Sequence, residues 1–113
     1  MIANLNLGNV VGDLNSSIQQ LNTAGCTELA EGVRRMTAAL GSSQELNDDS
    51  RKEMLEHLSV VSEESAKPAE QRKMGPLKSS LVALRSGIGV AAQLFAVYQG
   101  LEHALKAAGI IPG

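Results

Sequence analysis

The stretch LKSSLVALRSGIGVAAQLFAVYQGLEHALKAAG, residues 77–109, decides the fold that the sequence predicts. Its apolar residues follow alternating steps of four and three, the spacing of a helix seam: Leu77, Leu81, Leu84, Ile88, Ala91, Phe95 and Tyr98. Gly109 stands where a glycine suits the left-handed position after a helix, and Ile110 can then fold back onto Leu105. The pattern predicts one long C-terminal helix.

The same stretch carries a ladder of small residues, each four positions after the last: Ala92, Ala96, Gly100, Ala104 and Ala108. Small side chains at this spacing let another helix approach closely. We interpret Ala92, Ala96, Gly100 and Ala104 as an oligomer interface. The uncharged run of residues 86–101 is shorter than the roughly 20 residues that span a membrane, which favours a core helix.

Two further helices are predicted upstream by apolar residues at helical spacing. The first is capped at Thr27, and its apolar stripe is Leu29, Val33, Met36 and Leu40. The second starts at Asn47 or Asp48 and buries Met54, Leu55, Leu58 and Val61. It ends before Pro68, because a residue that precedes proline is disfavoured in the helical region.

The joint between these helices and the last one is AKPAEQRKMGPLKSS, residues 66–80. Its characteristic residues are Lys67, Pro68, Arg72, Gly75, Pro76 and Lys78. Pro68 stops the preceding helix, and Pro76 suits the first turn of the final one. The basic side chains of the joint follow an acidic helix, so we expect them to meet carboxylates of that helix or of another subunit.

The N-terminal segment, residues 1–22, differs from the rest. In ANLNLGNVVGD the apolar Leu5, Leu7 and Val11 alternate with Asn4, Asn6 and Val10, which predicts a short Gly/Asn-rich strand. No second strand follows, so the segment is either loosely ordered or pairs with the same segment of another copy. After Asp13, helical spacing predicts a short helix that ends at Asn22.

Composition limits the class of protein. The chain has 113 residues, enough for one domain, and its aromatic content is 2%, so Leu, Val, Ile, Met and Ala must build the core. A net charge of −2 argues against nucleic-acid binding. Cys26 is the only cysteine, and the first residues lack the pattern of a secretory signal, so we expect a cytoplasmic protein.

No motif in the sequence predicts a reaction. GIGVAA, residues 87–92, spells a dinucleotide-binding pattern, but it lies inside a helical pattern without a preceding strand. Glu53 and His57 share a helix face and could hold a metal with Glu102 and His103, but a surface ion pair is the favoured reading. We expect no enzyme, no cofactor and no metal site.

Residues 63–94, EESAKPAEQRKMGPLKSSLVALRSGIGVAAQL, resemble the helical portion of abortive-infection AbiTii-like proteins of bacterial defence systems. The N-terminal LNLGNVVGDLN is similar to the Gly/Asn segment that precedes such helices. The resemblance implies a bacterial protein of defence or regulation that acts through assembly. It carries over no catalytic residue.

Together these features predict a mainly α protein. We expect one domain, residues 1–113, with an extended assembly segment at residues 1–22 and a bundle of three to four helices at residues 23–113. The predicted function is a non-enzymatic module that forms homo-oligomers, with a further protein partner encoded nearby as an open possibility. The alternative is a membrane-perturbing effector that oligomerises and inserts residues 81–105.

Overall fold

The computed structural model describes residues 2–89 and 91–112, with side-chain positions from residue 10 onward. Within these residues the chain forms five α-helices and one short 3-10 helix, and the prediction of a mainly α fold is confirmed. They are α1 (Ile2–Thr23), α2 (Thr27–Ser42), α3 (Asp48–Ala66), η1 (Ala69–Gln71), α4 (Met74–Ile88) and α5 (Ala92–Ala107).

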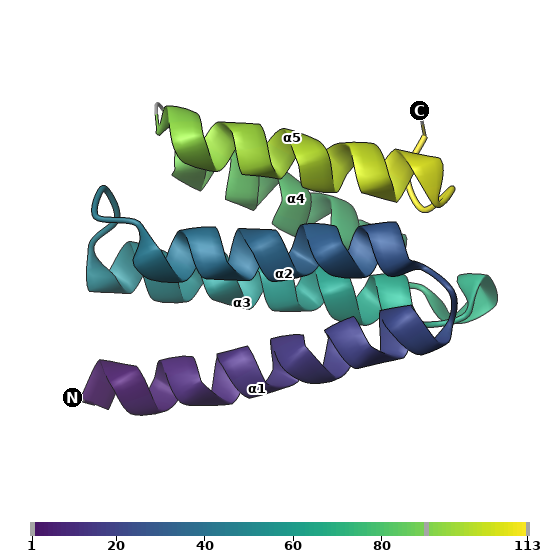
Figure 1. The fold of residues 1–113 in the computed structure, drawn as a ribbon, viewed down its shortest axis with the longest axis horizontal. Helices are drawn as coiled ribbons and strands as arrows, with labels where there is room; N and C mark the ends of the chain where they lie inside the picture. The colour runs from purple at the N-terminus through teal and green to yellow at the C-terminus, as the bar shows by residue number, and fades with distance from the viewer. Residues whose placement is uncertain (1, 90, 113) are drawn as a thin grey trace.

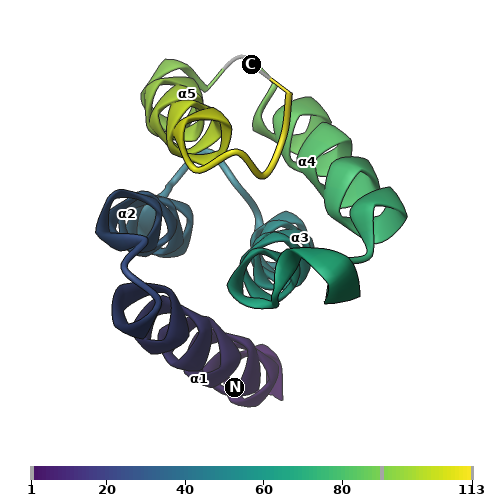
Figure 2. The same cartoon turned by 90° about the vertical axis from the view of Figure 1, so that its right-hand side faces the viewer.

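Successive helices run up and down along the long axis of the molecule (Figure 1). Seen end-on, α2, α3, α4 and α5 occupy the corners of a square, and α1 packs outside it against α2 and α3 (Figure 2). Short connections place consecutive helices antiparallel, as in other helix bundles. The edge of the square between α4 and α5 lies opposite α1 and has no further helix over it (Figure 2).

The core is built almost entirely from aliphatic side chains, as the composition predicts. Leucines from every α-helix are completely buried, among them Leu14, Leu29, Leu58, Leu84 and Leu101. Tyr98 is the one aromatic residue in the buried core of the described chain. Such a core depends on close packing between helices, because no large ring spans the space between them.

The predicted N-terminal strand is wrong, because residues 2–23 form α1. The helical spacing that begins at Leu14 extends backwards, and Leu14, Ser17 and Leu21 are buried against the rest of the bundle. A lone strand would leave its backbone ladder unpaired, whereas a helix satisfies its own hydrogen bonds and still buries one face. Residues 10–22 are therefore part of the bundle and not a separate extended segment.

The predicted single C-terminal helix is also wrong, because it is divided into α4 and α5. The division occurs at Gly89, which has φ 57° and ψ −119°, a conformation that side chains with a Cβ avoid. The amide of Ala91 donates to the carbonyl of Ile88 at 3.1 Å and closes the turn. The break turns one seam into two antiparallel helices, so Leu84 and Tyr98 both point into the core from different sides.

Several helix ends follow the local signals in the sequence. Asn47 caps α3, and its side chain accepts a hydrogen bond from the amide of Ser50 at 2.8 Å. Gly109 has φ 75°, and the amide of Ile110 donates to the carbonyl of Leu105 at 3.0 Å, which confirms the predicted C-terminal cap. Gly25, with φ 88°, ends α1 in the same way.

Candidate functional site: a groove between α2 and α5

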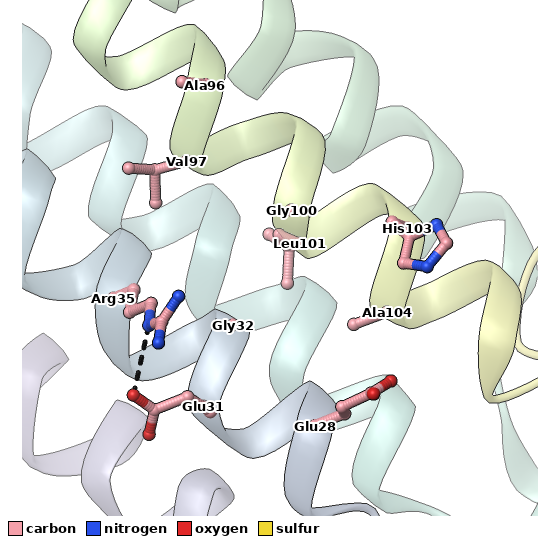
Figure 3. A pocket seen from close by; sticks show the side chains of 10 residues that line it. All are labelled: Glu28, Glu31, Gly32, Arg35, Ala96, Val97, Gly100, Leu101, His103 and Ala104. Carbon is pink, nitrogen blue, oxygen red and sulfur yellow. Dashed lines mark hydrogen bonds and ion pairs between the residues drawn. The ribbon is translucent and has the colours of Figure 1, made fainter.

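A groove of about 420 Å³ runs between α2 and α5 (Figure 3). One wall comes from α2, through Glu28, Glu31, Gly32 and Arg35. The other comes from α5, through Ala96, Val97, Gly100, Leu101, His103 and Ala104. Three of the four residues interpreted as an interface on α5 therefore line this groove.

The groove exists because the two helices touch at small residues. An added Cβ at Gly32 would lie 3.5 Å from the Cα of Leu101 and 3.9 Å from the Cβ of Ala104, which is ordinary contact. Ala104 is buried in this contact, while Ala96 and Gly100 are exposed beside it. A Cβ at Gly100 would meet nothing within 4 Å, so the floor there is open backbone that another helix could approach.

Charged side chains line the α2 wall. Glu31 accepts hydrogen bonds from Arg34 and from Arg35, the latter at 3.1 Å between Oε2 and Nε. These hydrogen bonds, that from Arg34 first, lower the pKa of Glu31 to about 2. The carboxylate is therefore ionised at any physiological pH. The wall presents the carboxylates of Glu28 and Glu31 and the guanidinium group of Arg35, while Arg34 lies outside the lining residues.

The other proposed interface residues lie apart from this groove. Ala92 is exposed at the start of α5, outside the lining residues. Val11 is half-buried in α1. Leu5 and Leu7 belong to α1, and their side-chain positions lie outside the described part of the structure. The structure thus gathers Ala96, Gly100 and Ala104 but does not bring Val11 to the groove.

Two basic residues of the joint contact α3, the helix that precedes it. Lys67 follows the last residue of α3, and its Nζ lies 2.8 Å from a carboxylate oxygen of Glu64. Arg72 donates to the carbonyl of Ser65 at 3.3 Å. Pro68 precedes η1, Gly75 and Pro76 lie in the first turn of α4, and Lys78 is exposed on α4. Lys67 and Arg72 thus contact the preceding helix of the same chain.

The four residues considered as metal ligands, Glu53, His57, Glu102 and His103, lie on two different helices, α3 and α5. In the described part of the chain, no three His, Cys, Asp or Glu residues lie close enough to hold a metal. His57 Nε2 lies 3.8 Å from Glu53 Oε1, and Glu102 lies on another helix, 3.9 Å from Lys106 Nζ. Cys26 is half-buried at the start of α2.

The α2 wall of the groove was missed by sequence reasoning. Glu28, Gly32 and Arg35 lie four and three residues apart, so the sequence does show that they share a helix face. What it does not show is that this face meets the small-residue ladder of α5. Gly32, a glycine inside a helix, was the only local signal of a close approach.

Comparison with known proteins gives no match to a protein-family model, to a curated protein or to a solved structure. The fold and the groove together define the class of protein. Within residues 2–89 and 91–112 it is a small bundle of five α-helices with an open groove between two of them. Among the described residues, no helix is both long enough and apolar enough to cross a membrane.

Proposed function

We propose that the protein is a non-enzymatic interaction module that associates with further copies of itself through the outer face of α5. The observation that carries this proposal is the open groove floor at Ala96 and Gly100, where backbone is exposed beside the contact of Gly32 with Leu101. A helix from a second copy that lies along this floor would bury the exposed small residues without displacing any side chain.

The charges beside the groove support the same mode of association. Glu31 and Arg35 on α2 and His103 on α5 flank the small residues. In a two-fold symmetric pair the same patch is used by both subunits, so each copy brings carboxylates and cations to the edge of the contact. Opposite charges at an edge set the register of the two helices more than they set affinity.

Light scattering coupled to size exclusion tests the proposal. We expect a mass of two chains or more at micromolar concentration for the unaltered protein. Gly100→Leu fills the groove floor with a branched side chain and should shift the mass to one chain. A mass of one chain for the unaltered protein, or an unchanged mass for Gly100→Leu, would refute self-association through α5.

Gly41→Leu is the matched control for this experiment. Gly41 is an exposed helical glycine whose added Cβ would also meet nothing within 4 Å, but it lies outside the groove. The control should keep the mass of the unaltered protein. Deletion of residues 1–22 is not a suitable test of assembly, because it removes the fully buried Leu14 and Leu21 from the core.

We further propose that this module acts in the cytoplasm, in a bacterial anti-phage defence or regulatory system. The support for this context is the resemblance of residues 63–94 to AbiTii-like proteins, and phage challenge of cells with and without the gene tests it. Equal plaque counts across a panel of phages would remove the defence role. Residues 81–105, which would insert together in a membrane-perturbing effector, are divided between the two antiparallel helices α4 and α5.

A further inference from the structure

A second groove lies between α4 and α5. These two helices form the side of the bundle opposite α1 (Figure 2). Its volume is about 470 Å³, and its lining includes Ile111 and Pro112, which follow α5. None of its lining residues is shared with the α2–α5 groove. It is therefore independent of the surface proposed for self-association.

The floor of this groove is apolar. Leu81, Val82 and Tyr98 all line it; Leu81 and Tyr98 are buried, and Val82 has 66% of its surface exposed. Val82 is the one large hydrophobic side chain that is exposed in the part of the chain with described side chains. Because Val82 lines the groove and is exposed, apolar groups of a ligand in the groove could contact it together with Leu81 and Tyr98.

The rim of the groove is basic. Lys78 and Arg85 on α4 and Lys106 on α5 are exposed, and Glu102 is the only carboxylate among the lining residues. Glu102 is already in contact with Lys106, at 3.9 Å, and accepts from the hydroxyl of Tyr98 at 3.4 Å. The rim thus carries two cations in excess of its ion pair, on a chain whose net charge is −2.

The spacing of the cations fits a helical ligand. Lys78 and Arg85 are seven residues apart on α4. Seven residues rise about 10.5 Å, close to two turns of a second helix laid alongside. Val82 lies between them on the same helix, so an apolar anchor is flanked by a cation on each side. An amphipathic helix with its apolar face on Val82 and carboxylates one turn away on each side would match this arrangement.

We propose that the α4–α5 groove binds an acidic amphipathic helix of another protein, with apolar side chains on Val82 and Leu81 and carboxylates at Lys78 and Arg85. A second copy of this chain does not fit these requirements. Its most acidic helix, α3, buries its own apolar residues Met54, Leu55 and Leu58 in the core. No apolar face of α3 is free to enter the groove while the bundle stays folded.

Fluorescence anisotropy with a designed peptide tests this proposal. The probe is a labelled helical peptide of about five turns, with leucines at positions i, i+3, i+4 and i+7 and glutamates on both flanks. Its isomer carries lysine in place of each glutamate. We expect saturable binding of the glutamate peptide to the full chain and binding of the lysine isomer that is weaker by at least about tenfold.

Variants of the groove should move this binding in defined directions. Lys78→Glu together with Arg85→Glu should weaken the glutamate peptide by about tenfold or more and give the lysine isomer the advantage. Val82→Asp should also weaken binding of the glutamate peptide, because it places a carboxylate on the apolar floor. Arg35→Glu, a charge reversal in the α2–α5 groove, should leave binding unchanged. All four positions are exposed, so the fold should be retained.

Three outcomes would overturn the proposal. One is equal affinity for the two peptides, or the same affinity after the double charge reversal. Another is the lack of saturable binding of the glutamate peptide up to about 1 mM. If vesicles of phosphatidylglycerol sedimented the protein in that case, the groove would be assigned to a lipid surface instead. A third is loss of self-association in the Lys78/Arg85 variant, which would assign the groove to a second copy.

Discussion

The carboxylate of Glu64 accepts a hydrogen bond from the backbone amide of Lys73 at 2.8 Å, across nine residues of sequence. Its other oxygen lies 2.8 Å from Nζ of Lys67. A carboxylate near the end of α3 thus binds the residue that precedes α4 and fixes the path of the joint. These hydrogen bonds, that from Lys67 first and that from Lys73 next, lower the pKa of Glu64 below its ordinary value.

Glu64→Gln is expected to lower the free energy of unfolding at pH 7 and to have less effect in acid. Because the pKa of Glu64 is lower in the folded than in the unfolded state, its contribution is fully present above pH 4.5 and is lost as the pH falls through the folded value. Urea unfolding of both proteins at neutral pH and at successively lower pH measures this difference. Glu56→Gln, an exposed carboxyl on the same helix, is the control. A difference that stays constant on acidification would contradict the role given to Glu64.

Arg51 binds the connection between α2 and α3, and we expect its replacement to lower the free energy of unfolding. Its guanidinium donates to the carbonyls of Leu40, Ser43 and Leu46 at 3.2, 2.6 and 3.0 Å. Arg51→Ala should reduce the free energy of unfolding by about 2–3 kcal/mol, since three carbonyls lose a charged donor. Arg51→Lys should recover only part of this, because an ammonium group lacks the planar fork.

Chemical denaturation followed by circular dichroism measures these two variants. Arg35→Ala, which replaces an exposed arginine of α2, serves as the comparison and should change stability by less than about 0.5 kcal/mol. If Arg51→Ala behaved like Arg35→Ala, the three carbonyl contacts would have no energetic weight.

Gly89 should not tolerate a side chain. Its positive φ lies at the break between α4 and α5, and Gly89→Ala is expected to destabilise the fold by about 1–2 kcal/mol. Gly12→Ala should do the reverse. Gly12 lies within α1 with nothing within 4 Å of an added Cβ, so alanine should stabilise the helix there by about 0.5–1 kcal/mol. Thermal unfolding of the two variants measures the sign of each change in stability. Stabilisation by both would mean that the backbone at Gly89 prefers a continuous helix.

Gly87 allows α4 to pack on Met54 of α3. An added Cβ at Gly87 would overlap the terminal methyl and sulfur atoms of Met54, whose side chain is buried. Gly87→Ala should therefore cost about 1 kcal/mol, because the strain is partly relieved by rotation of a flexible methionine and partly offset by the better helix propensity of alanine. In a Met54→Ala background the same substitution should become neutral or stabilising. A double-mutant cycle by urea unfolding measures the coupling, and additivity would show that the two positions do not touch.

Local signals predicted α2, α3 and most helix ends. The apolar stripe from Leu29 to Leu40, the cap at Asn47 and the stop before Pro68 all depend on neighbours within a few residues, so a single sequence is enough to show them. The aliphatic core and the C-terminal cap at Gly109 are of the same kind. Ala96, Gly100 and Ala104 could also be placed on one helix face from their spacing alone.

The errors arose where one segment fits two local structures. Residues 4–11 alternate like a strand, but they belong to α1, which packs as a helix against α2 and α3. This packing buries Leu14, Ser17 and Leu21 of α1. The seam from Leu77 to Tyr98 reads as one helix, but folding back at Gly89 lets both halves bury their leucines in a single core. In each case burial against distant residues outweighed the local pattern.

The sequence by itself therefore determined an α-helical chain, the composition of its core and the faces of its individual helices, because these depend on periodicity and capping within a few residues. Only the tertiary structure decided that Gly32 meets Leu101, that α4 and α5 leave a basic groove around Val82, and that Glu64 reaches Lys73. The physical reason is that the residues on one helix face do not specify which other helix that face will contact. Which faces meet is set by the packing of the whole bundle, through contacts between residues far apart in the chain.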